Sequence, residues 1–165
     1  MDQRVRVYLG LGSNIDAGRH LRGAVSRLEA AFGRLSVSRV CRTPAVGFAG
    51  ADFYNLAVGL DTERDLDELT TILRGIEEAE GRARGGAKFA PRTLDIDVLT
   101  YGALVRQDKP MLPRADILEY AFVLGPLADI ASAECHPVLG VPYGALWAAF
   151  EGAREEFEWI ENFWE

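Results

Sequence analysis

The amino-acid sequence predicts one α+β domain in which two helices pack on one face of an antiparallel sheet. Its apolar patterns follow each other in the order strand, helix, strand, strand, helix, strand, which is typical of a split β-α-β sandwich. A chain of 165 residues that is 48% apolar suits one core better than two. We therefore expect a single domain over residues 1–165, with residues 151–165 as an acidic, aromatic C-terminal extension.

Four segments have the composition of strands and end at turn-forming residues. Residues 4–11 alternate β-branched and aromatic residues with others and then reach Gly12, where a turn is expected. The other three strands are expected over residues 35–42, 53–62 and 94–102.

Two helices are expected between these strands, because apolar residues recur there at helical spacing. The first ends at Gly33. The second begins after Asp65, where Glu68 completes a capping-box pattern, and runs to about Glu80. Residues after Gly102 are expected to form short strands, turns and a helical ending. The apolar positions are Leu21, Val25, Leu28 and Phe32 in the first helix and Leu66, Leu69, Ile72, Leu73 and Ile76 in the second.

The charge and hydropathy of the chain limit the partners that it can have. The formal net charge is −7, and residues 151–165 contribute −5 of it through six Glu and one Arg. Such an acidic chain is not suited to general nucleic-acid binding, which depends on neutralising phosphates. No apolar stretch reaches the roughly 20 residues that a membrane-spanning helix needs, and no secretory signal is recognisable at the N-terminus. We therefore expect a cytoplasmic protein, and we also expect a monomer.

Residues 81–92 form a basic segment within this acidic chain. They contain four cationic side chains and no acid, and two consecutive glycines give the segment freedom to open and close. Arginine offers two parallel hydrogen bonds to phosphate oxygens, so a clamp for a polyanionic ligand is one interpretation. The alternative is an ordinary solvated loop. The four cations are Arg82, Arg84, Lys88 and Arg92.

Asp95 and Asp97 follow directly on this segment, in the fourth expected strand. Residues two apart in a strand point to the same face, so the two carboxylates are expected side by side, roughly 7 Å apart, while Ile96 and Val98 face the core. A carboxylate pair suits Mg²⁺, which takes few protein ligands and leaves positions for water and phosphate. The alternative is an ordinary solvated face of the sheet, on which neighbouring like charges repel each other.

A third group of residues could hold a flat heterocycle. Phe53 and Asn55 lie in the third expected strand, Thr43 to Val46 form the turn before it, and Phe122 follows the fourth strand. Aromatic faces with one amide and exposed backbone groups bind flat rings. The alternative is that these residues only contribute to the core.

The segment from Lys88 to Leu99, KFAPRTLDIDVL, closely resembles the signature of the 6-hydroxymethyl-7,8-dihydropterin pyrophosphokinase family. Enzymes of this family transfer pyrophosphate from ATP to a pterin in folate biosynthesis. Further matches occur in the family's order and spacing over most of residues 5–130. They are residues 8–14 (YLGLGSN), 42–44 (RTP), 52–55 (DFYN), 76–77 (IE), 81–84 (GRAR), 122–124 (FVL) and 126–127 (PL).

The resemblance implies a ferredoxin-like α+β fold and a transfer in which the pterin hydroxymethyl oxygen attacks the β-phosphorus of ATP and AMP leaves. It also implies that Asp95 and Asp97 hold two Mg²⁺ ions that bridge the ATP phosphates. The phosphate-clamping loop would supply Arg82 and Arg92 as catalytic residues, together with Arg84, Lys88 and Phe89. ATP would also meet Arg74, Glu77 and Arg114, whereas the pterin would meet Thr43, Pro44, Val46 and Asn55 and stack between Phe53 and Phe122.

Two positions depart from the family pattern and leave alternatives open. Arg114 stands where the family typically has His, and Tyr120 stands where it has Arg, so the cations around the nucleotide phosphates differ in geometry. One alternative is a divergent enzyme that acts on a modified pterin. The other is a catalytically silent ligand-binding or partner-binding module of the same fold, but the retained Asp pair and the four loop cations argue against silence.

The C-terminal extension matches no family pattern. Phe157, Ile160 and Trp164 fall near helical spacing, which predicts a helix that docks on the domain. The alternative is an exposed aromatic stripe that serves as a contact surface for a partner.

Overall fold

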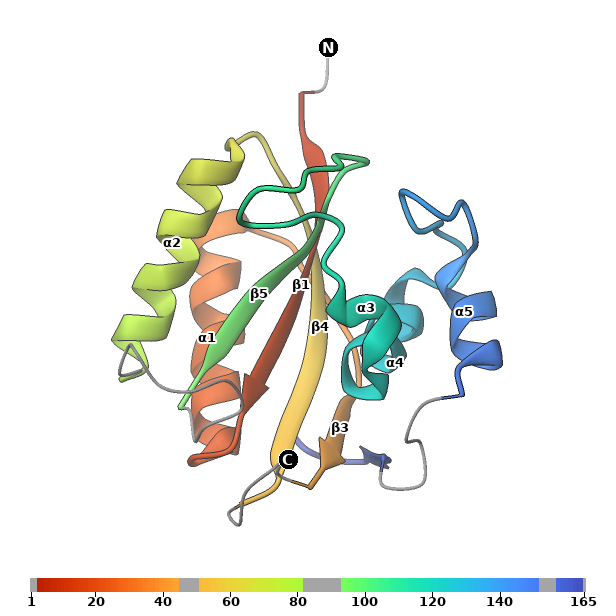
Figure 1. The fold of residues 1–165 in the computed structure, drawn as a ribbon. Coiled ribbons are helices and arrows are strands. Elements are labelled where there is room, and N and C mark those ends of the chain that lie inside the picture. Colours follow the sequence, from red (N-terminus) through yellow and green to blue (C-terminus); the bar gives the residue numbers. More distant parts are fainter. Residues whose placement is uncertain (1–2, 45–50, 82–92, 152–156, 165) are drawn as a thin grey trace.

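The computed structural model describes residues 3–44, 51–81, 93–151 and 157–164. Within these ranges an antiparallel sheet of six strands forms the middle layer, and helices pack on both of its faces (Figure 1). The expected α+β fold, an antiparallel sheet with helices packed on it, is therefore confirmed. No helix in the described ranges is long and apolar enough to cross a membrane.

The elements follow the expected order as far as the fifth strand and then continue with three helices and a last strand. The strands are β1 (Val5–Ser13), β2 (Ser36–Val37), β3 (Val40–Thr43), β4 (Phe53–Thr62), β5 (Asp95–Tyr101) and β6 (Glu158–Ile160). The helices are α1 (Ala17–Phe32), α2 (Leu66–Ala79), α3 (Asp116–Glu119), α4 (Ala121–Ala131) and α5 (Tyr143–Ala149).

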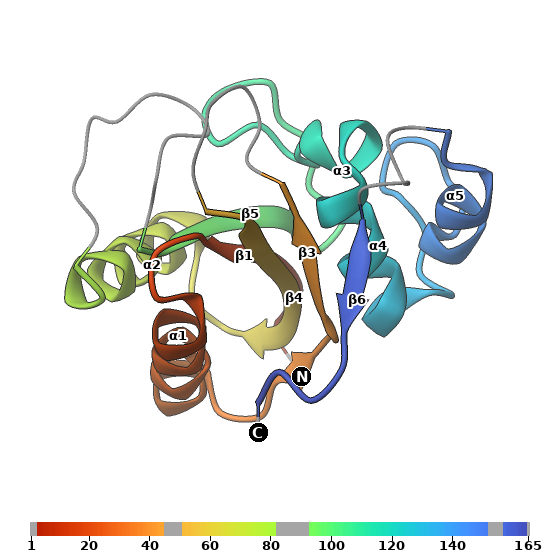
Figure 2. The same ribbon diagram turned by 90° about the horizontal axis from the view of Figure 1, so that it is seen from below.

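Strand β1 lies inside the sheet, between β4 and β5. It pairs antiparallel with β4 from Val5, opposite Thr62, to Ser13, opposite Tyr54, and it pairs with β5 along its other edge. The strand order β5-β1-β4-β3-β6 is the split β-α-β arrangement with β6 added beside β3 (Figure 2). Helix α2 begins with the expected capping box, in which the Glu68 N–H donates to the Asp65 side chain at 2.8 Å.

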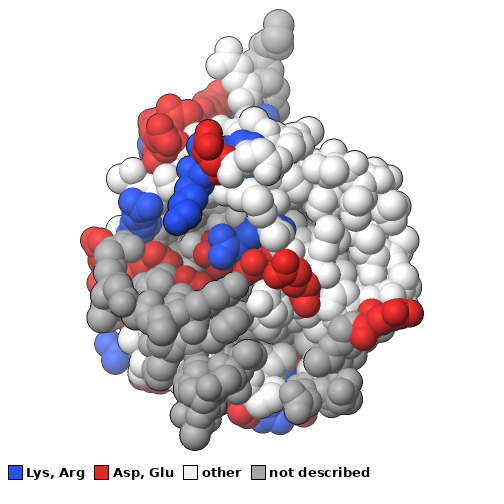
Figure 3. Space-filling model, viewed as in Figure 1, with Lys and Arg blue, Asp and Glu red and all other residues white. Residues whose placement is uncertain are grey.

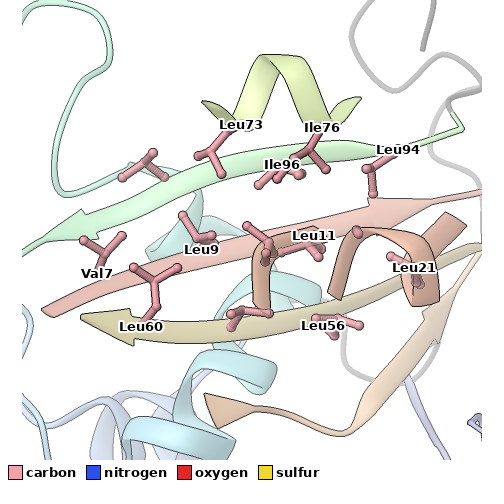
Figure 4. Close-up of a cluster of buried hydrophobic side chains, with 14 of the residues drawn as sticks. Val7, Leu9, Leu11, Leu21, Leu56, Leu60, Leu73, Ile76, Leu94 and Ile96 are labelled. Atoms are coloured by element: carbon pink, nitrogen blue, oxygen red, sulfur yellow. The ribbon is translucent and has the colours of Figure 1, made fainter. Parts of the chain in front are cut away.

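Alternation along β1 builds the main core. Val7, Leu9 and Leu11 point toward α1 and α2 and are almost fully buried. Figure 4 shows them in one cluster with Leu21 of α1 and Leu73 of α2. This face of the sheet holds the molecule together and leaves the other face available for a different use.

The two expected helices, α1 and α2, share one face of the sheet as predicted. The opposite face is covered by α4 and α5, which the sequence did not predict there. Tyr8 of β1 and Leu99 of β5 pack there against Leu124 of α4 in a second buried cluster. The sequence did not predict α4, because Gly125 and Pro126 lie inside it and both are read as helix breakers.

The strand expected over residues 35–42 is divided into β2 and β3. The pairing of this segment with β4 shifts by one residue between the two strands. Ser38 lies at the shift, where its hydroxyl accepts a hydrogen bond from the Ala57 N–H at 2.8 Å and its own N–H donates to the Ala57 carbonyl at 2.9 Å. A side chain creates this irregularity, so hydrophobic periodicity could not predict it.

The helix expected at the C-terminus is also wrong. Residues Glu158–Ile160 form β6, which pairs antiparallel with β3 at the edge of the sheet. A segment this short fits helical and strand periods equally well. The pairing decides between them, because β3 offers an open edge of backbone N–H and C=O groups.

We predict that Leu9→Ala lowers the free energy of unfolding by about 3 kcal/mol, because it removes a fully buried side chain from the central strand. Leu118→Ala is the matched control, since Leu118 is 42% exposed, and it should change stability by less than about 0.5 kcal/mol. Urea unfolding followed by circular dichroism measures both values. Equal losses in the two variants would contradict the assigned core.

Candidate active site

A cleft of about 820 Å³ of empty space, counted with the solvent at its mouth, lies on the face of the sheet that carries α4. Strands β1, β4 and β5 form its floor, the end of β3 borders it, and the chain from Arg114 to Val123 forms its wall. Figure 3 shows acidic and basic side chains side by side in the middle of the viewed face, next to a broad uncharged surface. One end of the cleft carries charged groups and the other carries aromatic rings.

The charged end begins with the carboxylate pair of β5. Asp95 lies opposite Gly12 and Asp97 opposite Gly10 in the pairing with β1, and both side chains line the cleft. Ile96, between them, points into the main core. The alternation expected from the sequence is therefore present, and the two carboxylates share one face.

Arg114 lies across this pair. Its N–H donates to the Leu99 carbonyl of β5 at 2.9 Å, which places it beside the strand. The guanidinium then reaches Asp97, with Nη2 at 3.7 Å from Oδ1, and Asp116, with Nε at 3.3 Å from Oδ2. Asp116 is a third carboxylate at the cleft, and sequence reasoning missed it because no spacing rule connects it to the β5 pair.

The surroundings of Asp97 disfavour its negative charge. Burial and, next, the negative charge of the neighbouring Asp95 raise the pKa of this carboxyl to about 7, although the Arg114 guanidinium opposes the shift. The side chain is still 30% exposed, so solvent screens part of this effect. A positive charge placed between the two carboxylates would relieve the repulsion, and carboxylate oxygens are the ligands that Mg²⁺ prefers.

Glu77 of α2 holds the backbone of β5 between Asp95 and Asp97. It is 4% exposed in α2, and its Oε2 accepts a hydrogen bond from the Ile96 N–H at 2.8 Å. This bond fixes the start of β5, where Asp95 stands. Arg74 lies one helical turn earlier on the exposed surface of α2. Neither side chain lines the cleft formed by the described residues.

The other end of the cleft is aromatic. Phe53 at the start of β4, Thr43 at the end of β3 and Phe122 in α4 line it together. The Phe122 ring stacks on Tyr120, with ring centroids 5.0 Å apart and an interplanar angle of 22°. Tyr120 thus adds aromatic surface beside Phe122. Pro44 is exposed at the end of β3 and does not line the cleft.

Asn55 lies at the floor of this end. Its Nδ2 donates to the Leu11 carbonyl at 3.4 Å, and its Oδ1 is buried without a hydrogen-bond partner among the described residues. A Cβ atom at Gly12 would come within 2.6 Å of Nδ2, so only glycine leaves room for the amide there. Buried polar atoms are normally paired, so the free oxygen is suited to a donor on a bound ligand.

Six of the expected site residues lie outside the described residues. These are Val46 and the five members of the basic segment, Arg82, Arg84, Lys88, Phe89 and Arg92. The described residues bring together Thr43, Phe53, Asn55, Asp95, Asp97, Arg114 and Phe122 in one cleft.

The fold and the cleft define a ferredoxin-like α+β protein whose candidate site combines a carboxylate pair with an aromatic slot. Residues 8–132 match the family model of 7,8-dihydro-6-hydroxymethylpterin-pyrophosphokinase, and the chain belongs to this family. The resemblance found in the sequence is confirmed.

Two curated relatives resemble the chain over most of its length. A protein of Methylorubrum extorquens named 2-amino-4-hydroxy-6-hydroxymethyldihydropteridine pyrophosphokinase is 47% identical over 131 residues, which are 76% of this chain and 82% of the relative. A protein of Bacillus subtilis with the same name is 37% identical over 128 residues, which are 74% of this chain and 76% of the relative.

Solved structures share the fold. Wild-type Plasmodium falciparum HPPK-DHPS with SDX-DHP matches 94% of this chain with a TM-score of 0.73 at 14% identity. This chain spans about half of that protein's length, namely 47%. At such low identity the likeness concerns the fold alone.

We predict that Asp97→Asn stabilises the metal-free protein at high pH. A folded-state pKa of about 7 lies above the ordinary Asp value of 3.8, so ionisation of Asp97 costs stability as the pH rises from about 4 through 7. The variant should gain on the order of 1 kcal/mol more at pH 8 than at pH 5, because solvent screening reduces the full effect. Urea unfolding with EDTA at both pH values tests this. A gain that does not depend on pH would contradict the electrostatic explanation.

Proposed function

We propose that this cleft transfers the pyrophosphate group of ATP to the hydroxymethyl group of 6-hydroxymethyl-7,8-dihydropterin, giving AMP and the pterin diphosphate. The observation that carries the proposal is the combination, in one cleft of a pyrophosphokinase-family chain, of the β5 carboxylate pair and an aromatic slot with an unpaired amide oxygen. The first suits a metal and phosphates, and the second suits a flat heterocycle that donates hydrogen bonds.

The acceptor would bind at the aromatic end. A pterin ring between Phe53 and Phe122 gains stacking and apolar burial, and its ring N–H and amino groups are donors for the free Oδ1 of Asn55. Thr43, together with Val46, would contribute contacts from the backbone. The Asn55 amide is already held in place by its hydrogen bond to the Leu11 carbonyl, so it loses little conformational freedom when a ligand binds. Its oxygen therefore favours ligands that present a hydrogen-bond donor.

The nucleotide would bind at the charged end. Asp95 and Asp97 would hold two Mg²⁺ ions there, and bound Mg²⁺ supplies positive charge to the ATP phosphates. Arg114, held by Asp116, would add a cation from the wall of the cleft. Glu77 keeps β5 in position below the pair. The basic segment would clamp the remaining phosphate oxygens through Arg82, Arg84, Lys88 and Arg92, with Phe89 and Arg74 near the nucleotide.

The transfer needs positioning more than covalent catalysis. The hydroxymethyl oxygen attacks the β-phosphorus, the new O–P bond forms, and the bond from that phosphorus to the oxygen of the α-phosphate breaks. AMP leaves with that oxygen, and the hydroxyl proton passes to solvent. The cleft contributes by holding the two substrates in line and by neutralising phosphate charge. The similarity to two proteins named as pyrophosphokinases does not favour a modified acceptor or a silent module.

We predict that Asp97→Ala and Asp95→Ala each lower AMP release by about 100-fold or more without unfolding the protein, because both carboxylates face the cleft rather than the core. Asp67→Ala, on the exposed surface of α2, is the matched control and should keep full activity. The assay uses ATP, Mg²⁺ and 6-hydroxymethyl-7,8-dihydropterin. EDTA should stop AMP release by the wild type and added Mg²⁺ should restore it. Full activity in EDTA would exclude the metal assignment.

We predict that Asn55→Ala weakens pterin binding by about tenfold or more, since a buried hydrogen bond to the ligand is lost. The Kd of ATP with Mg²⁺ should change less than about twofold, because Asn55 lies at the other end of the cleft. Fluorescence titration with the pterin and calorimetry with the nucleotide measure the two values. If both affinities fall by the same factor, Asn55 maintains the structure of the whole cleft and does not bind the pterin specifically.

A further inference from the structure

We propose that the C-terminal strand, β6 with the adjacent Phe157, sets the width of the acceptor slot by locking β3 to α4. The proposal rests on the proposed function, because it takes the aromatic end of the cleft as the pterin site. Residues 157–164 lie beyond the family match, which ends at residue 132. They nevertheless contact both elements that border the slot (Figure 2).

The first contact is the backbone pairing of β6 with β3. Ile160 lies opposite Val40, and Glu158 lies opposite Arg42. The next residue of β3 is Thr43, which lines the slot and lies opposite Phe53 in the pairing with β4. One wall of the slot is therefore continuous with the strand that β6 covers.

The second contact lies at the seam between β3 and α4. Arg39, just before β3, donates from its backbone N–H to Asp129 of α4 at 2.9 Å and from Nη2 to the same carboxylate at 2.8 Å. The ring of Trp159 covers this guanidinium, with the Arg39 Cζ atom 4.1 Å from the ring centroid. The Arg39 side chain is still 57% exposed, so solvent screens the ion pair, and the ring contributes mainly by holding the guanidinium in place through the cation–π contact.

The third contact presses on α4 itself. Phe157 and Trp147 pack together with ring centroids 5.3 Å apart, and each comes within 3.1 Å of the Cβ position that Gly125 leaves empty. Gly125 lies one helical turn after Phe122, whose ring forms the other wall of the slot. Phe157 also packs edge-on against Trp159, with ring centroids 4.8 Å apart, so the contact at the seam and the contact on α4 are joined through these two rings.

Ion pairs also connect β6, β3 and the start of β4. Arg42 pairs with Glu158 on one side and lies 3.9 Å from Asp52, the residue before Phe53. All three side chains are more than a third exposed, so these ion pairs contribute little energy. The aromatic contacts and the strand pairing therefore carry the positioning.

This arrangement separates the two ends of the cleft. The walls of the slot are Phe53 on β4 and Phe122 on α4. They are joined by direct packing of α4 on β4 and, in addition, through the extension. Asp95 and Asp97 stand on β5, which does not pair with β6. Loosening the seam should therefore widen the slot and leave the nucleotide end in place. A wider gap between ring and wall removes part of the van der Waals and stacking energy, which weakens binding.

Trp159→Ala in the full-length protein tests the proposal. The Kd of 6-hydroxymethyl-7,8-dihydropterin, measured by fluorescence with a non-hydrolysable ATP analogue and Mg²⁺ present, should rise about tenfold. The Kd of the nucleotide should stay within about twofold. Trp159→Phe, which keeps a ring over Arg39, should restore most of the affinity. Trp164→Ala is the matched control, because Trp164 is 40% exposed and lies outside the seam.

A second readout separates slot width from general loss of structure. The ratio of kcat/KM for the pterin to that for a pterin with an added ring methyl group should fall in Trp159→Ala, because a wider slot discriminates less against bulk. Asp129→Asn breaks the same seam from α4 and should act in the same direction, which covers the case in which Trp159→Ala does not fold.

Three outcomes would overturn the proposal. They are unchanged pterin affinity in both seam variants, an equal loss of nucleotide affinity, and unchanged discrimination against the bulkier acceptor. A wild-type protein that binds the pterin but releases no AMP would contradict the proposed transfer, and the comparison of binding affinities would still decide the role of the extension. A wild type that binds no pterin would overturn both.

Discussion

The alternation of side chains along β1 is the constraint on which the rest of the structure depends. Leu9 and Leu11 point into the core under α1 and α2, and the residues beside them, Gly10 and Gly12, form part of the floor of the cleft. One strand therefore builds the stable layer and the ligand site at the same time. A side chain at Gly12 would collide with the amide of Asn55, so this end of the cleft requires glycine in β1.

Two carboxylates on one face of β5 give the cleft an unfavourable electrostatic energy, and the well-packed core beside them holds them in place. Asp95 and Asp97 share one face, and burial with their mutual repulsion raises the pKa of Asp97 to about 7. Asp116 is the third carboxylate at the cleft, whereas Glu77 lies outside it and accepts a hydrogen bond from the backbone of β5. Arg114 offsets part of the charge from the wall. Such a site is preorganised for positive charge, and the apolar side chains on the other face of β5 keep it in place.

The edge of the sheet connects distant parts of the chain to the aromatic slot. Strand β6 covers the open edge of β3, which removes exposed backbone groups that could pair with another chain. Trp159 covers an ion pair between Arg39 and Asp129, so a residue near the C-terminus stabilises the junction between the sheet and α4. The acceptor end of the cleft is thus bordered by elements that are far apart in sequence, and its shape is a property of the whole fold.

The sequence by itself determined three of the four expected strands, the two long helices, the family, and the shared face of Asp95 and Asp97. These features follow from local periodicity and a specific motif. The division of the remaining strand into β2 and β3 was not predictable from periodicity. Tertiary structure decided what depends on partners. Helix α4 forms despite Gly125 and Pro126 because it covers the second face of the sheet, and the extension became a strand because β3 offered an edge. The free oxygen of Asn55 likewise has no signature in sequence, since a missing partner is visible only when all neighbours are in place.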